Sequence, residues 1–133
     1  MNDVIKFLEE NSLVYLATKG LDGEAKVRPI LYYFEENDVP YFCTANTKSM
    51  FKELDADPKF EMTTATPEFQ WIRIKGEVEF IDDVELKQKV IDSNEIVKSL
   101  YSTGDNPVFE LFTIHGDATI ADFSGNPAKH YKI

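Results

Sequence analysis

The sequence has one cysteine and two arginines among its 133 residues. A single cysteine excludes an intramolecular disulfide and any metal site built from several thiolates. One free thiol suits a reducing compartment. Cys43 follows Tyr41 and Phe42 in an apolar run, so we expect it to be buried as a small hydrophobic side chain.

Positive charge is also scarce, with 14 Lys and Arg against 24 Asp and Glu and a net charge of −10. Affinity for nucleic acid depends largely on cations that replace the counterions of the phosphates. We therefore expect no nucleic acid partner, and no anionic membrane partner for the same reason. No apolar run approaches the roughly 20 residues of a membrane span. Asp3, Glu9 and Glu10 interrupt any apolar leader, so we expect a cytoplasmic protein.

Histidine is equally rare, and His115 and His130 are the only two. No Asp or Glu stands at a spacing that marks a metal site, and no glycine-rich nucleotide-binding motif is present. We expect both histidines to be ordinary surface or turn residues. Hydrolytic and metal-dependent chemistry is therefore not indicated.

Aromatic residues, in contrast, are abundant, with ten Phe and six Tyr, which suits strands and a packed core. The length fits a single domain over residues 1–133. Patterning predicts a mostly antiparallel β fold of the α+β or barrel class. The expected helices are 3–10, 46–56 and 84–101, the last broken near residues 93–94, and the expected strands are 13–18, 25–34, 39–44, 60–66, 69–81, 108–114 and 118–123.

The connections between these elements lead to further expectations. Asn2 or Asp3 caps the first helix, and Asn46 or Thr47 caps the second. Short loops predict that the first three strands form an antiparallel meander. The last two strands form a hairpin about residues 115–117, and residues 124–133 are irregular.

The two arginines, Arg28 and Arg73, both fall on expected strands. In the expected strand 69–81 the side chains alternate, which predicts Trp71, Arg73 and Lys75 on one face and Ile72 and Ile74 on the other. Arginine offers a planar fork of donors that matches phosphate and planar polar rings. Two scarce arginines on strands are therefore candidates for ligand binding, although exposed strand arginines without a function would give the same pattern.

A second candidate is the segment 44–49, Thr-Ala-Asn-Thr-Lys-Ser, at an expected strand-to-helix junction. The free N–H groups at a helix start attract anions, and a lysine with hydroxyls there completes a phosphate cradle. Simple capping of the helix by Asn46 or Thr47 is the alternative.

The order of these motifs resembles the pyridoxamine 5'-phosphate oxidase-like FMN-binding split barrels, and within them the small nitroimidazole-resistance-type (Nim-like) proteins. The resemblance runs from about Val4 to Phe123. It implies an FMN-binding split β-barrel that is completed as a homodimer, with FMN at the subunit interface. It rests on residues 13–18 (LVYLAT) with 22–23 and 28–29, on 41–44 (YFCT) leading into 47–49, on the helix ending at 54–58, and on 71–78 (WIRIKGEV).

The resemblance implies a phosphate site at one end of the flavin. By position, Arg28 matches the strand arginine that meets the flavin phosphate or ribityl chain. Thr44, Thr47, Lys48 and Ser49 match the phosphate-binding turn. Arg28 and Lys48 would then supply local positive charge within an acidic protein.

It also implies a set of residues around the flavin ring. Pro29 and Ile30 match the backbone that passes the ring. Trp71 stands where the family often has a glutamine or aromatic residue that reaches FMN from the partner subunit. Arg73 is a neighbour on the same face.

The chain departs from true pyridoxamine-phosphate oxidases at two places. Residues 122–133 contain no arginine, whereas the oxidases end in an arginine-containing segment that holds pyridoxal phosphate. Their Ser-Arg-Lys phosphate turn is replaced by Thr-Lys-Ser-Met at residues 47–50. Pyridoxamine-phosphate oxidation is therefore not expected.

The function implied is that of an FMN-dependent oxidoreductase, a reductase of a small planar electron acceptor such as a nitroaromatic compound. Hydride or electron transfer would pass through the flavin N5. Three alternatives remain open: a flavin-binding or flavin-sensing module without turnover, a relative that binds F420 or haem, and a structural dimer with an empty cleft.

Overall fold

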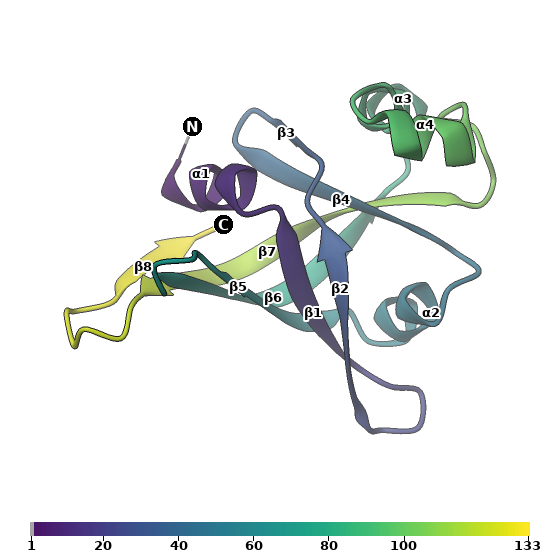
Figure 1. Ribbon diagram of the computed structural model, residues 1–133. Helices are drawn as coiled ribbons and strands as arrows, with labels where there is room; N and C mark the ends of the chain where they lie inside the picture. The colour runs from purple at the N-terminus through teal and green to yellow at the C-terminus, as the bar shows by residue number, and fades with distance from the viewer. Residues whose placement is uncertain (1) are drawn as a thin grey trace.

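The computed structural model describes residues 2–133, and its strands form one antiparallel sheet in the order β2-β1-β5-β6-β7-β4-β3, with β8 paired to β7. The sheet curls into a half-barrel (Figure 1). The expected mostly-β class is confirmed. The strands are β1 (Leu13–Lys19), β2 (Ala25–Leu31), β3 (Phe34–Glu36), β4 (Val39–Ala45), β5 (Lys59–Ala65), β6 (Trp71–Ile81), β7 (Phe109–Ala121) and β8 (Lys129–Lys132).

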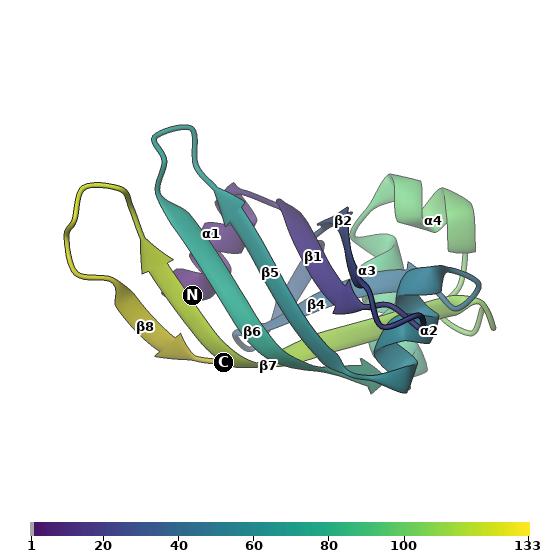
Figure 2. The ribbon, with the colours of Figure 1, turned by 90° about the horizontal axis from the view of Figure 1, so that it is seen from below.

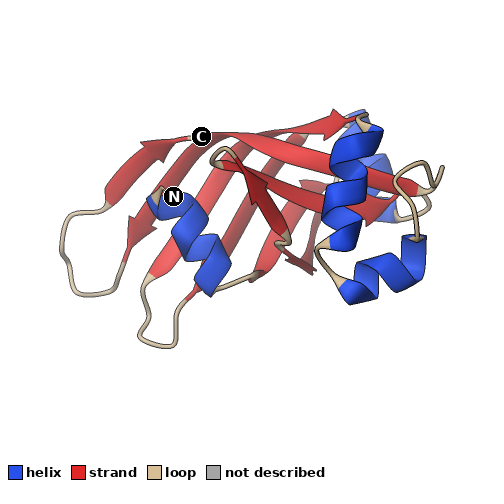
Figure 3. Ribbon diagram, turned by 90° about the horizontal axis from the view of Figure 1, so that it is seen from above, coloured by secondary structure: helices blue, strands red, loops and turns tan. Residues whose placement is uncertain are grey.

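Helices lie against the concave side of this sheet and at one end of it (Figure 3). They are α1 (Asp3–Glu10), α2 (Ser49–Ala56), α3 (Val84–Asp92) and α4 (Glu95–Tyr101). Asn2 caps α1 as expected, because its side chain accepts a hydrogen bond of 2.8 Å from the Ile5 amide. The expected break between α3 and α4 is confirmed: Asn94 caps α4 by accepting from the Ile96 and Val97 amides.

The main core lies on the concave side and follows from strand alternation. Register places Leu16 opposite Met62, Met62 opposite Ile74 and Ile74 opposite Ala118, and all four side chains are buried. Helix α1 adds its apolar face to the same cluster. As predicted, the odd-numbered residues of β6 from position 71 to 75 face the other way.

The predicted meander of the first three strands is wrong. β2 ends at Leu31, and residues 34–36 form the separate strand β3, so the predicted turn at 35–38 shrinks to Asn37 and Asp38, which both have positive φ. β4 pairs with β3 and β7 and not with β2. The chain therefore crosses from one edge of the sheet to the other, and within the described residues the outer edge of β2 has no partner strand.

The predicted hairpin at residues 115–117 is also wrong, because β7 is continuous from Phe109 to Ala121. Gly116 lies directly opposite Gly76 of β6. A Cβ built on Gly76 would meet the His115 carbonyl oxygen at 1.8 Å. The glycine pair therefore allows the two long strands to approach closely within the curled sheet rather than turning the chain.

The tail, expected to be irregular, forms β8 on the outer side of β7. The Ile133 amide and the Gly116 carbonyl are joined at 3.0 Å, and the Tyr131 hydroxyl donates to Asp3 at 2.8 Å. These contacts attach the end of the chain to β7 and to α1.

Candidate functional site

The turn between β4 and α2 carries the segment predicted to bind phosphate. α2 begins at Ser49 with Lys48 as its N-cap residue, and no side chain of the described residues caps it. The predicted cap by Asn46 or Thr47 is therefore wrong. Asn46 instead donates to the Pro107 carbonyl at 2.7 Å. The first amides of α2 are thus left for a ligand or for water.

Thr47, Lys48 and Ser49 are all exposed at this turn, whereas Thr44 at the end of β4 is only 3% exposed. The Thr44 hydroxyl has no hydrogen-bond partner among the described residues. Buried hydroxyls are nearly always paired, and an unpaired one costs stability. An orphaned hydroxyl at the end of the strand that leads into an uncapped helix start is compatible with a ligand-binding turn.

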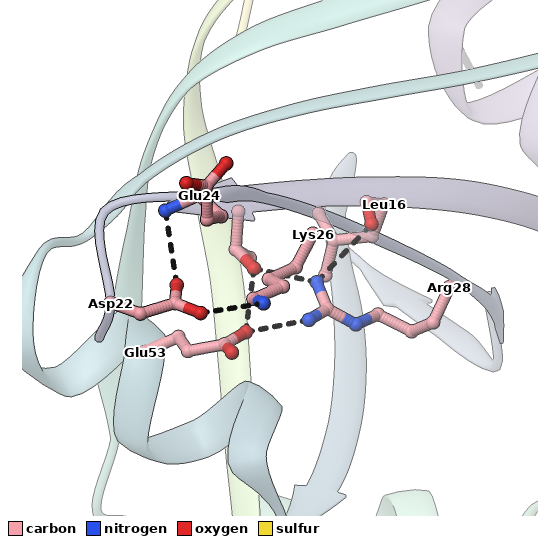
Figure 4. A network of polar contacts seen from close by, with 7 residues as sticks. Leu16, Asp22, Glu24, Lys26, Arg28 and Glu53 are labelled. Atoms are coloured by element: carbon pink, nitrogen blue, oxygen red, sulfur yellow. Dashed lines mark hydrogen bonds and ion pairs between the residues drawn. The ribbon is translucent and has the colours of Figure 1, made fainter. Parts of the chain in front are cut away.

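Arg28, on the concave side of β2, is held inside the protein. Its Nη2 donates to the Glu53 carboxylate at 2.6 Å, and its Nη1 donates to the Thr18 hydroxyl at 2.7 Å and the Leu16 carbonyl at 3.3 Å (Figure 4). The Thr18 hydroxyl also donates to Glu53 at 2.8 Å. Thr18 and Glu53 are buried. This network joins β1 and β2 to α2.

The other predicted residues lie elsewhere. Pro29, Trp71 and Arg73 face the convex side of the sheet, and Ile30 packs against the concave core. Register shows the separation, because Arg28 pairs with Leu16 on one face while Arg73 pairs with Thr63 on the other. Within one chain the structure therefore divides the predicted site into two groups. The turn group comprises Thr44, Thr47, Lys48 and Ser49, and the convex-face group comprises Pro29, Trp71 and Arg73.

Trp71 and Arg73 of the convex-face group line a shallow cleft of about 530 Å³. The Arg73 guanidinium lies 5.2 Å from the centre of the Trp71 ring, a cation–π contact that orients both side chains. The lining is largely apolar, with few polar groups. It comprises Tyr15, Ala17, Val27, Glu61, Met62, Thr63, Trp71, Arg73 and Phe123.

Around this cleft several large apolar side chains are exposed. Figure 2 shows it with β1, β5, β6 and β7 in front and α1 behind them. Contiguous exposed apolar side chains on one sheet face mark an interaction surface. The large apolar side chains here are exposed by 42–79%: Leu13, Tyr15, Val27, Leu31, Phe69 and Phe123.

Sequence reasoning missed Glu53 and Thr18. Glu53 looked like one of many solvated carboxylates. A signal was present, because Glu53 follows Met50 by three residues and precedes Leu54, so it falls on the buried stripe of α2. A carboxylate in that position needs a partner.

Cys43, which was expected to be buried, is half-buried beside Tyr33 and Tyr101. It packs against a second core cluster, formed by Leu86, Val90, Ile91, Val97, Phe109 and Leu111. Burial raises the pKa of its thiol to about 12, and the positive charge of Lys48 acts in the opposite direction. The native thiol should therefore react with a disulfide reagent at about pH 8 at least tenfold more slowly than the thiol of the urea-unfolded chain. Equal rates in the two states would contradict the buried placement.

Among residues 2–133, no group of three or more His, Cys, Asp or Glu is arranged to hold a metal ion. Both histidines are exposed, and His115 pairs with Glu79 at 2.7 Å. No helix in the described chain is long and apolar enough to cross a membrane.

Comparison with known proteins gives a family and a set of structural neighbours. The family model described as pyridoxamine 5'-phosphate oxidase matches residues 3–120. A NimC/NimA family protein from Clostridium acetobutylicum is 31% identical, with a TM-score of 0.88 over 98% of this chain and 90% of that chain. No curated protein matches the sequence significantly.

More distant structures share the fold. A pyridoxamine 5'-phosphate oxidase-related, FMN-binding protein from Nostoc punctiforme has a TM-score of 0.71 at 15% identity, covering 97% of this chain and 87% of that chain. A haem-binding protein from Mycobacterium smegmatis has a TM-score of 0.72 at 15% identity, covering 91% and 52%. At this identity the likeness extends to the fold alone.

Proposed function

Because this chain belongs to the pyridoxamine 5'-phosphate oxidase family, we propose that it is an FMN-binding flavoprotein that acts as a homodimer and reduces a small planar electron acceptor. The acceptor class includes nitroaromatic compounds. A cytoplasmic location is part of the proposal and is supported by the free thiol of Cys43.

The observation that carries the FMN proposal is the orphaned hydroxyl of Thr44. The residues around it fit a phosphate group, since an uncapped helix start offers amides and the exposed turn offers Lys48 with the hydroxyls of Thr47 and Ser49. Arg28 is part-buried and contacts α2 through Glu53, one helical turn after Ser49. These residues would hold the phosphate end of FMN.

The convex-face cleft fits the other end of the ligand. A flavin ring is planar and largely apolar, and Trp71, Tyr15 and Val27 offer surfaces of that kind. Pro29 lies on the same face, opposite Tyr15. The turn group and the cleft belong to opposite faces of one sheet. Because one chain does not bring the two together, the proposal requires a second copy, placed so that its turn group meets this chain's Trp71 and Arg73.

Bound FMN would supply the redox chemistry at its ring. The chain's own residues would bind and orient it and shield one face of the ring from water. The planar acceptor would then stack on the exposed face of the ring. A general acid or base is not required of the protein for this reaction.

The visible absorption spectrum of the purified protein, with the released ligand identified by mass, tests the proposal. Flavin bands and release of FMN are expected, followed by bleaching under anaerobic NADH or NADPH and recovery on addition of a nitroaromatic acceptor. Tight FMN binding without reduction by either nucleotide would favour a flavin-binding module without turnover. A colourless protein that takes up no added FMN would contradict the proposal that the chain binds flavin.

Replacing Thr44 with valine should separate ligand binding from folding. Valine is nearly isosteric and removes the unpaired hydroxyl, so the apo-protein should gain about 1 kcal/mol in the free energy of unfolding. Affinity for FMN should fall about tenfold, because one hydrogen bond to the ligand is lost. Isothermal titration and urea unfolding of the apo-protein measure the two effects.

Thr113 provides the matched control, since it is also 3% exposed but its hydroxyl donates to the Pro40 carbonyl at 2.7 Å. Thr113→Val should lose about 1 kcal/mol of stability and keep its FMN affinity. If Thr44→Val destabilised the apo-protein as much as Thr113→Val does, the Thr44 hydroxyl would have an internal partner and would not mark a ligand site.

A further inference from the structure

Arg28 uses much of its hydrogen-bonding capacity on the protein itself. Within the described chain it donates three hydrogen bonds, to Glu53, Thr18 and Leu16. Arginine has five N–H donors, so some remain for a ligand. Its side chain is 24% exposed, which leaves it within reach of a bound anion.

Glu53 carries the opposing charge. Its side chain is 7% exposed and its Oε1 accepts from both Arg28 and Thr18. Glu53 follows Ser49, the first residue of α2, by one helical turn. Residues at this spacing lie on the same side of a helix, with their Cβ atoms about 6 Å apart. A buried carboxylate therefore lies one turn below the turn group.

We propose that Glu53 is an internal counter-ion of Arg28 that competes with the flavin phosphate for this arginine. Its charge thereby lowers the affinity for FMN, and it leaves the affinity for riboflavin, which has no phosphate, unchanged. The inference rests on the proposed FMN site at the turn group. A phosphate dianion near the Arg28–Glu53 pair is attracted by one member and repelled by the other. Because Glu53 is shielded from solvent, salt screens its repulsion only weakly.

This arrangement assigns different roles to the two cations of the site. Lys48 is exposed at the helix start and provides the net positive charge. Arg28 is already neutralised and acts mainly by fixed hydrogen bonds. In the free protein, Glu53 keeps Arg28 ordered and paired. The same carboxylate limits how strongly a phosphate is held.

Glu53→Gln tests the inference because glutamine keeps an acceptor for Arg28 and Thr18 but removes the charge. The apo-protein is titrated with FMN and with riboflavin, which lacks the phosphate, and flavin fluorescence is followed. The variant should bind FMN about tenfold more tightly than the wild type and riboflavin equally well. Asp55→Asn is the control, since it makes the same charge change at an exposed position on α2 and should leave both affinities unchanged.

A double variant, Arg28→Gln with Glu53→Gln, keeps the test decisive if Glu53→Gln alone folds poorly. The double variant removes both charges together and so leaves neither one unpaired. The double variant should bind FMN within about threefold of the wild type, whereas Arg28→Gln alone, which leaves Glu53 unpaired, should bind about a hundredfold more weakly. A double variant as weak as Arg28→Gln would overturn the inference, as would an unchanged FMN affinity in Glu53→Gln. A wild-type protein that binds neither flavin would overturn the proposed function as well.

Discussion

Replacing Gly76 with alanine should lower the free energy of unfolding by about 3 kcal/mol. A Cβ at this position would lie 1.8 Å from the His115 carbonyl oxygen and 2.8 Å from the Cα of Gly116. Both neighbours are backbone atoms of the paired strand β7, so neither can rotate away. β6 and β7 would have to separate at the Gly76–Gly116 pair, within the longest strand pairing of the sheet. Urea unfolding followed by the fluorescence of Trp71, at a fixed protein concentration, measures the effect.

Gly125 is the matched control for this substitution. It has a φ of +87° and no atom within 4 Å of an added Cβ. Gly125→Ala should therefore cost only the backbone strain of a positive φ, about 1 kcal/mol. Equal losses for the two variants would mean that the glycine pair is not a steric requirement of the sheet.

The pairing of β6 with β7 shows where sequence reasoning succeeded and where it failed. The alternation in β6 correctly predicted which side chains share a face, because a strand's two faces are set by local periodicity. Gly116 suggested a turn, since glycine is common in turns. Its actual role depends on Gly76, which is distant in the sequence and becomes its neighbour only when the strands pair.

Strand partners were harder to predict than strands. Residues 25–34 read as one strand because Tyr32, Tyr33 and Phe34 favour β structure. The structure instead ends β2 at Leu31 and sends the chain to the opposite edge of the sheet. Short connections usually join neighbouring strands. The pairing of β4 with β7, however, depends on packing between segments that are far apart in the sequence, so a short stretch of sequence does not reveal it.

The candidate site was predicted as a set of residues, but its internal contacts were not. The turn from Thr44 to Ser49 was located from its hydroxyls, its lysine and its place before a helix. The assignment of Asn46 as a cap failed because its partner, the Pro107 carbonyl, is 61 residues away. The contact of Arg28 with Glu53 is likewise long-range and gives the arginine a structural role beside any ligand role.

Replacing Tyr15 with aspartate should dissociate the proposed homodimer, with a dissociation constant raised about a hundredfold or more. Tyr15 is 46% exposed on the convex face, between Pro29 on β2 and Thr63 on β5. The side chain is already half in solvent within one chain, so the monomer should stay folded. In a dimer each copy would bury an unpaired carboxylate in an apolar surface, which is costly. Size-exclusion chromatography with light scattering measures the mass.

Ile96 of α4 provides the control, because it is 71% exposed and Ile96→Asp introduces the same charge outside the convex face. That variant should keep the mass of a dimer and its bound FMN. Tyr15→Asp should lose FMN along with the dimer, because Trp71 and Arg73 would no longer meet the turn group of the partner. If Tyr15→Asp remained dimeric, the convex face would not be the interface. If it became monomeric but held FMN as tightly as the wild type, the turn group of a single chain would suffice for the ligand and the convex-face cleft would have no part in binding it.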